Sequence, residues 1–171
     1  MKNHKKNIVL IGMPAVGKST IGVLLAKRLG RYFLDTDVFI QAIVGKTLQQ
    51  IIDADGLDKF CEIEAEHIFC IDKIDCVIAT GGSVVYSDVA MKRLKENGII
   101  VYLDLPLDMI KKRLTDLNIR GVVMSKGQTI DDLYKKRSPL YEKWADFTID
   151  CLKLTHEQVV DKIIENLKIS L

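Results

Sequence analysis

The stretch Gly12-Met-Pro-Ala-Val-Gly17-Lys18-Ser19-Thr20 matches the phosphate-loop pattern G-x-x-x-x-G-K-[S/T] at every required position. It follows the apolar run 8–11 and opens the helix-like run 20–29. Phosphate binding needs this order of strand, tight loop and helix start, because the loop and the first helical turn present backbone N–H donors to anionic oxygens. The sequence therefore predicts a chain that binds a nucleoside triphosphate.

The residues of this loop have separate expected tasks. Glycines at 12 and 17 let the backbone turn and approach the phosphate closely. Lys18 can reach the β- and γ-phosphates, and Ser19 offers a hydroxyl group to Mg²⁺. The predicted ligands are thus a nucleoside triphosphate and Mg²⁺, and the predicted nucleotide-binding residues of the loop are Gly12, Ala15, Val16, Gly17, Lys18, Ser19 and Thr20.

Length and composition indicate one globular domain. The chain has 171 residues, of which 48% are hydrophobic and 28% charged, and its formal net charge is +2. That charge is too small to indicate nucleic-acid or membrane binding. The N-terminal apolar run is interrupted by Gly12 and Pro14, and no segment approaches the roughly 20 apolar residues of a membrane span. We therefore expect a monomeric, cytoplasmic domain over residues 1–171, with no nucleic-acid or membrane partner.

Short apolar runs alternate with longer helical patterns, which is typical of a parallel sheet covered on both faces. Strands are expected near 8–11, 32–34, 76–79, 99–103 and 147–149. Helices are expected at about 18–29, 37–44, 47–54, 57–72, 87–97, 106–116, 129–144 and 155–169. Gly30 ends the first helix, and Thr155 with Gln158 forms a capping box at the last one. The four cysteines lack metal-site spacing, which favours buried thiols.

Two short motifs follow predicted strands. Asp35-Thr36-Asp37 comes after the second strand and Gly81-Gly82 after the third, at the sheet edge where ligands collect in open parallel sheets. One acid could hold the metal while the other orients an acceptor hydroxyl, or both could cap the following helix. Adjacent glycines permit a close backbone approach to a ligand, although an ordinary turn explains them as well.

Arginines near the end of the chain are candidates for phosphate or acceptor binding. The segment 117–128 has no clear periodicity, and a loop of that length is often a lid. Arg120 lies in it, Arg113 lies late in the preceding helix, and Arg137 precedes Ser138-Pro139-Leu140-Tyr141. A lid arginine that closes over the γ-phosphate would stabilise charge in phosphoryl transfer, whereas a solvated helix face is the plain alternative for each of them.

In their order and spacing these motifs resemble shikimate kinases, in the nucleoside-monophosphate-kinase branch of P-loop proteins. The resemblance covers nearly the whole chain and implies a three-layer α/β P-loop kinase fold, with a five-stranded parallel sheet in the order 2-3-1-4-5. It also implies a mobile lid at about 117–128 and an acceptor-binding helical region at about 38–66. The implied reaction is ATP-dependent phosphorylation of shikimate to shikimate 3-phosphate.

The resemblance also implies residue roles. Lys18, Asp37 and Arg120 would be catalytic: Lys18 on the transferring phosphate, Asp37 on the acceptor hydroxyls and their proton, and Arg120 closing over the phosphates. Ser19 and Asp35 would hold Mg²⁺, Asp35 through water, and Arg113 would lie by the adenine. The implied acceptor-binding residues are Asp37, Gly81, Gly82 and Arg137, with Arg137 on the carboxylate.

The chain departs from the family pattern at three positions. Family members usually carry a second carboxylate-binding arginine directly after the phenylalanine of the acceptor region, where this chain has Cys61 after Phe60. A thiol cannot replace a guanidinium group, whose charge-assisted hydrogen bonds contribute about 1.5–3 kcal/mol. Losing them should weaken carboxylate binding by roughly one to two decades. Ser83 replaces a glycine, and the lid reads Arg120-Gly-Val-Val123; both changes conserve size or polarity.

Three functions are therefore open from the sequence. The first is a kinase that phosphorylates shikimate. The second, which Cys61 motivates, is a kinase on the same scaffold for another small hydroxylated molecule, such as a sugar acid, a polyol or a hydroxy amino acid. The third is an ATP-binding module without catalysis. Against it, the chain retains the charged and hydroxyl groups that transfer requires, at Lys18, Ser19, Asp35, Asp37 and Arg120.

Overall fold

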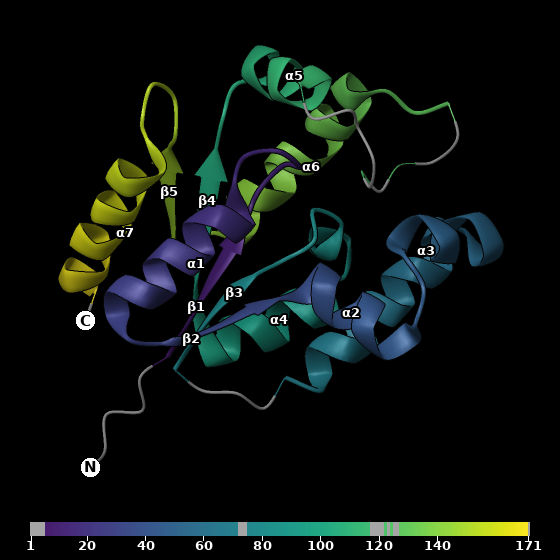
Figure 1. Cartoon of the computed structure of the whole chain (residues 1–171), viewed down its shortest axis with the longest axis horizontal. Coiled ribbons are helices and arrows are strands. Elements are labelled where there is room, and N and C mark those ends of the chain that lie inside the picture. Colours follow the sequence, from purple (N-terminus) through teal and green to yellow (C-terminus); the bar gives the residue numbers. More distant parts are fainter. Residues whose placement is uncertain (1–5, 72–74, 117–121, 123, 125–126, 171) are drawn as a thin grey trace.

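The computed structural model describes residues 6–71, 75–116, 122, 124 and 127–170 (Figure 1). Within these residues, parallel strands form one five-stranded sheet in the order β2-β3-β1-β4-β5. This order is the one that the resemblance implied, so the predicted fold class is confirmed. The strands are β1 (Asn7–Ile11), β2 (Tyr32–Asp35), β3 (Cys76–Ala79), β4 (Gly98–Asp104) and β5 (Phe147–Asp150).

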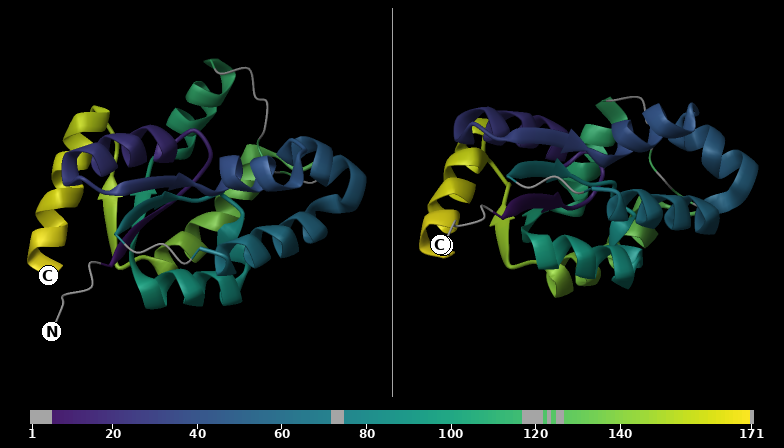
Figure 2. Two further views of the ribbon diagram at one scale, coloured as in Figure 1. Left: turned by 60° about the horizontal axis from the view of Figure 1, so that its bottom comes forward. Right: turned by 90° about the horizontal axis from the view of Figure 1, so that it is seen from below.

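Helices cover both faces of the sheet. On one face α1 and α7 pack against each other, and on the other α4 and α6 contact β4 (Figure 2). The helices α2 and α3 extend outward beyond the end of the sheet (Figure 1). The helices are α1 (Lys18–Leu29), α2 (Thr36–Val44), α3 (Leu48–Phe69), the 3₁₀ helix η1 (Val84–Tyr86), α4 (Asp88–Asn97), α5 (Leu107–Asp116), α6 (Ile130–Trp144) and α7 (His156–Ser170).

The central strands are apolar because both of their faces are covered. Every residue of β1 and of β3 is buried, which explains their continuous apolar runs. The polar exception is Asn7, whose Oδ1 accepts a hydrogen bond from the backbone N–H of Cys76 at 2.9 Å. That bond joins the beginnings of two adjacent strands and satisfies a polar group inside the core.

Hydrophobic periodicity located every strand to within one residue, and the helix predictions differ in two places. The two helices expected at 47–54 and 57–72 are confirmed as the two parts of α3, which meet at a kink at Gly56, whose φ of 84° is not helical; the second part ends at Phe69 and not at residue 72. The short helix η1 was not predicted, because three residues are too few to show a period. The predicted ends at Gly30 and Thr155 are confirmed: Gly30 is left-handed, with φ 65°, and Thr155 and Gln158 exchange their capping hydrogen bonds.

The cysteine expectation is only half correct. All four cysteines are free thiols, and Cys76 and Cys151 are buried. Cys61 is half-buried, and Cys70 is exposed because it caps the C-terminal end of α3. Over the residues that the structure describes, no helix combines the length and the apolarity needed to cross a lipid bilayer.

The sheet brings three loops together at one edge. Because β1, β2 and β3 are parallel neighbours, the segments at their carboxyl ends lie close together. These segments are the phosphate loop after β1, the Asp35-Thr36-Asp37 motif at the end of β2 and the Gly81-Gly82 motif after β3. The strand ends are tied directly, since both the backbone N–H and the hydroxyl of Thr80 donate to the carbonyl of Leu10, at 3.2 and 3.1 Å. Parallel pairing therefore places motifs from distant parts of the sequence at one site.

Candidate active site

The phosphate loop has the backbone geometry of a tight turn into a helix. Gly17 is the N-cap of α1 with φ 106°, and Ala15 has a left-handed φ of 63°. Gly12, with φ 145°, leaves no room for a side chain, because a Cβ there would lie 2.6 Å from the carbonyl oxygen of Leu103. Left-handed backbone in residues other than glycine is uncommon and concentrates at ligand-binding loops. The loop directs the first N–H groups of α1 toward one point outside the sheet.

The ammonium group of Lys18 folds back over this loop. Its Nζ donates to the carbonyl oxygens of Gly12 and Met13, at 2.7 and 2.9 Å. Burial lowers the pKa of Lys18 to about 8, and the carboxyl group of Asp37 acts in the opposite direction. The structure therefore places the lysine and the acid that the sequence paired in one partly buried cluster, where each influences the ionisation of the other.

Asp35 caps the following helix, and it also contacts the phosphate loop. Its Oδ1 accepts from the backbone N–H groups of Asp37 and Val38, at 3.0 and 3.3 Å, and so caps α2. Its Oδ2 accepts a hydrogen bond of 2.6 Å from the hydroxyl of Ser19 at the start of α1. Helix capping and the hydroxyl contact thus use different oxygens of one carboxylate. The pair of Ser19 and Asp35 supplies the oxygen ligands that suit Mg²⁺, which binds few protein groups.

Arg113 lies against the phosphate loop. Its Nη1 donates to the carbonyl oxygens of Ala15 and Val16, at 3.2 and 3.0 Å. The contact brings a positive charge from α5 to the predicted nucleotide site. Arg120, the other arginine predicted for this site, lies outside the described residues, as does most of the segment expected to form the lid.

Asp37 has a carboxyl oxygen, Oδ1, that is buried and accepts no hydrogen bond from any residue that the structure describes. Burial raises the pKa of Asp37 to about 6, against the opposing charge of Lys18. Thr36, between the two acids, is almost fully buried, and its hydroxyl accepts from the backbone N–H of Gly81 at 3.0 Å. The sequence did not single out Thr36, yet it joins the two motifs that line the site.

Gly81 and Gly82 are glycines because side chains crowd against them. The Oδ1 of Asp37 lies 2.5 Å from the position that a Cβ on Gly81 would occupy, and Nη1 of Arg137 lies 2.9 Å from the equivalent position on Gly82. Any larger residue would displace a charged group from the site. The backbone at Gly81 and Gly82 is therefore close to both the acid and the arginine, and the ligand contact expected from the double-glycine motif stays a prediction.

Arg137 is fully buried, with 0% of its side chain exposed. Its Nε donates to the hydroxyl of Tyr86 at 3.1 Å, and its guanidinium group lies 5.1 Å from the centre of the Tyr86 ring. The hydroxyl of Tyr141, one turn further along α6, donates to the carbonyl of Gly82 at 2.8 Å. Neither tyrosine was predicted as a site residue. The signal for Tyr141 was its spacing of four residues from Arg137, which puts both side chains on one face of the helix.

A second acid, Glu64, was also missed. Its side chain is 1% exposed, and Oε2 accepts a hydrogen bond of 2.8 Å from Ser83 Oγ. Burial raises the pKa of Glu64 to about 8, an effect that the hydrogen bond from Ser83 opposes. The sequence contained the signal: Phe60, Glu64 and Ile68 recur every four residues and form the buried stripe of α3.

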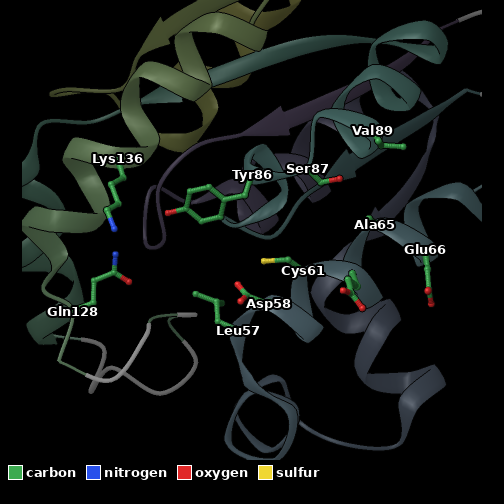
Figure 3. A pocket seen from close by; sticks show the side chains of 11 residues that line it. Leu57, Asp58, Cys61, Ala65, Glu66, Tyr86, Ser87, Val89, Gln128 and Lys136 are labelled. Carbon is green, nitrogen blue, oxygen red and sulfur yellow. The ribbon is translucent and has the colours of Figure 1, made fainter.

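Cys61 lines a cavity of about 650 Å³, which Tyr86 and Lys136 also line. Figure 3 shows Cys61 facing Tyr86 across the cavity, with Gln128 and Lys136 pointing toward each other at one end. Burial raises the pKa of the Cys61 thiol to about 11, so the group is uncharged at neutral pH. At this position the chain therefore contributes open space and no positive charge.

Comparison with known proteins agrees with this geometry. A family model described as Shikimate kinase matches residues 14–168. The chain belongs to the shikimate kinase family. The shikimate kinase of Thermodesulfovibrio yellowstonii is 44% identical over 163 residues, which cover 94% of each chain. The family assignment confirms the resemblance on which the site prediction was based.

Solved structures of the family have the same fold. A shikimate kinase from Acinetobacter baumannii in complex with shikimate superposes with a TM-score of 0.89 and 31% identity, over 97% of this chain and 94% of the other. The shikimate kinase of Aquifex aeolicus gives a TM-score of 0.82, also at 31% identity, over 95% and 96%. The five-stranded core and its helices are therefore shared along almost the entire chain.

The raised pKa of Glu64 predicts how stability depends on pH. Between its ordinary value of 4.5 and about 8, the folded protein keeps a proton on this group that the unfolded chain has lost. The free energy of unfolding therefore falls as the pH rises through this window. Replacing Glu64 by Gln removes this titration. The difference in unfolding free energy between Glu64→Gln and the wild type should therefore change in favour of the variant by on the order of 3 kcal/mol as the pH rises from about 5 to about 8.

Denaturant unfolding of both proteins across that range measures the difference directly. The exposed Glu62→Gln on the same helix is the matched control and should show no such trend. A constant difference between wild type and Glu64→Gln at every pH would contradict the buried, proton-retaining state of Glu64.

Proposed function

We propose that this protein transfers the γ-phosphoryl group of ATP to a hydroxyl group of shikimate, which gives ADP and shikimate 3-phosphate. One arrangement carries the proposal: the Gly81-Gly82 turn has the acid Asp37 on one side and the buried cation Arg137 on the other, beside the phosphate loop. Such a site suits a small molecule that has a hydroxyl group at one end and a carboxylate at the other. Shikimate has both groups.

The nucleotide would bind along the phosphate loop. The N–H groups at the start of α1 and the ammonium group of Lys18 would hold the β- and γ-phosphates, with Lys18 exchanging its two carbonyl contacts for phosphate oxygens. Ser19 and Asp35 would hold Mg²⁺, which supplies charge neutralisation between the phosphates. Arg113 would support the loop near the base, and Arg120 would close over the phosphates.

The acceptor hydroxyl would be oriented by Asp37. Its free Oδ1 can accept the hydroxyl proton as the oxygen attacks the γ-phosphorus, while the bond from that phosphorus to the bridging oxygen breaks and ADP leaves. The pKa of about 6 makes Asp37 a stronger base than an ordinary carboxylate, yet leaves it mostly ionised at neutral pH. Transfer of this kind gains most of its rate from positioning and electrostatics, which this cluster provides.

The carboxylate of the acceptor would bind Arg137. A planar guanidinium group can bind a carboxylate through two parallel hydrogen bonds, and Tyr86 fixes its orientation. The relatives named shikimate kinase and the neighbour solved with shikimate favour this acceptor over another hydroxylated metabolite. They also favour a kinase over an ATP-binding module without catalysis.

Shikimate-dependent release of ADP tests the proposal. With ATP and Mg²⁺ present, the purified protein should release ADP only when shikimate is added. Lys18→Ala and Asp37→Asn should each lower kcat by at least about 100-fold, because they remove groups that act on the reacting atoms. Lys27→Ala, an exposed lysine on the same helix, is the control and should remain fully active. A lack of stimulation at millimolar shikimate, or near-normal turnover in either site variant, would refute the assignment.

The cysteine at position 61 gives a second prediction. Cys61→Arg should lower the KM for shikimate by about tenfold or more, because a guanidinium group beside the cavity adds charge-assisted hydrogen bonds to the carboxylate. Cys70→Arg, at the exposed end of the same helix, adds the same charge at a distance and should leave KM unchanged. Equal KM values in the wild type and in Cys61→Arg would show that the carboxylate does not approach this position.

A further inference from the structure

Glu64 is a buried acid that makes no ion pair with any residue the structure describes. Its Oε2 accepts a hydrogen bond from the hydroxyl of Ser83, whereas Oε1 is buried and has no hydrogen-bond partner among the residues that the structure describes. An unsatisfied polar atom in a protein interior costs free energy, and native structures retain few of them. The free oxygen of Glu64 is therefore a position at which a bound molecule can supply the missing hydrogen-bond partner.

The direction of this oxygen identifies where that partner binds. Glu64 Oε1 and Asp37 Oδ1 both lie against the position that a Cβ on Gly81 would occupy, and neither has a hydrogen-bond partner in the described part of the chain. Each lies within about 2.5 Å of the position that a Cβ on Gly81 would occupy, so the two oxygens are about 5 Å apart or closer. Two free carboxyl oxygens thus face the same turn, which is the backbone of the acceptor site proposed above.

Charges from several elements act on Glu64. Desolvation has the largest effect on the pKa of Glu64 and raises it. The hydrogen bond from Ser83 lowers this pKa, and the negative charge of Asp37 raises it. The cations Arg137 and Lys18 favour ionisation, but neither is an ion-pair partner. The titratable groups that interact with Glu64 are Asp37 from α2, Lys18 from α1, Arg137 and Tyr141 from α6, and Cys61 from the preceding turn of its own helix.

The balance of these charges favours a neutral Glu64. Two ionised carboxylates at such a separation repel each other strongly when water is excluded. A carboxylate on the acceptor would add a third negative charge to the cluster. The phosphates of ATP would bind Lys18, whose positive charge would then compensate less of this negative charge. Cys61 supplies no compensating charge one turn away on α3. A proton on Glu64 removes the excess negative charge and leaves Asp37 as the ionised base.

We propose that Glu64 binds the acceptor directly as a neutral carboxyl group, and that it donates its proton in a hydrogen bond to an oxygen atom of the acceptor. This inference rests on the proposed function, because it names a second acceptor-binding acid in the same site. The proton stays on Glu64 throughout and no bond forms or breaks there. Glu64 therefore contributes to the affinity for the acceptor, whereas Asp37 acts on the reacting hydroxyl.

The proposal narrows the class of acceptor. A site with one ionised acid and one neutral acid around Gly81 can bind a ring with neighbouring oxygen atoms, since one carboxyl group accepts a hydrogen bond and the other donates one. It can also admit an anion toward Arg137, because Glu64 adds no repulsion. An acceptor with an ammonium group at this point would instead favour the ionised form of Glu64.

Steady-state kinetics of Glu64→Gln and Glu64→Ala as a function of pH test the proposal, with shikimate as the probe. Gln is neutral, has the same shape and can donate a hydrogen bond, so its KM near neutral pH should lie within about threefold of the wild-type value. Ala removes the bond and should raise KM by about tenfold or more. The value of kcat should change much less than KM in both variants.

The pH profile separates this role from a merely structural one. Above about pH 8 the KM of the wild type should rise by up to about tenfold per pH unit as Glu64 loses its proton. Titration of Lys18 is common to both proteins, so the ratio of wild-type KM to Glu64→Gln KM should rise in the same range. Parallel profiles, or a Gln variant as impaired as the Ala variant at neutral pH, would overturn the proposal.

Infrared spectroscopy tests the proton itself without turnover. At neutral pH the wild type should show a protonated-carboxyl C=O band that is absent from Glu64→Gln, both before and after shikimate is added. Absence of the band from the free wild-type protein would overturn the neutral state of Glu64. If the band is present but the protein does not phosphorylate shikimate, the proposed function is refuted and the neutral state of Glu64 is not. The failure of one proposal can therefore be distinguished from the failure of the other.

Discussion

The proposed acceptor site depends on the burial of one cation, the guanidinium group of Arg137. An ion in a protein interior costs several kcal/mol unless its donors are satisfied, and this side chain has no exposed surface. Tyr86 contributes a hydroxyl and a ring face to it, and Gly82 leaves room for Nη1. Tyr141 then holds the carbonyl of Gly82 in place. The packing that makes the burial of Arg137 tolerable also shapes a site for an anion.

The local sequence was sufficient to predict the phosphate loop, because spacing, glycines and the strand before it all follow from neighbouring residues. Asp35 and Asp37 were placed correctly at the sheet edge, since the end of a parallel strand locates them. Glu64 and Tyr86 were not found. Their roles depend on which surfaces α3 and η1 turn toward Arg137, and that is decided by tertiary packing. For Glu64, the four-residue spacing of buried positions indicated burial but not its partners.

The neutral thiol of Cys61 bears on both the acceptor and Glu64. Its thiol is neutral and lines an open cavity, where a cation at the same position would have acted on both the acceptor and Glu64. Without that cation, the site can retain an anionic acceptor if its second acid remains protonated. On the proposal made above, the departure from the family pattern at Cys61 and the neutral state of Glu64 belong to one change in charge balance. The chain would then catalyse the family reaction while binding its acceptor through a different set of charges.

Calorimetric binding of shikimate and of ATP to Arg137→Met tests most directly the claim that Arg137 binds the acceptor. Methionine fills the buried space without charge, and circular dichroism can establish that the variant folds. We expect shikimate to bind at least about tenfold more weakly while the affinity for ATP stays within about twofold. Arg113→Met, at the phosphate loop, is the control and should leave shikimate binding unchanged. Unaltered shikimate affinity in folded Arg137→Met would contradict the account.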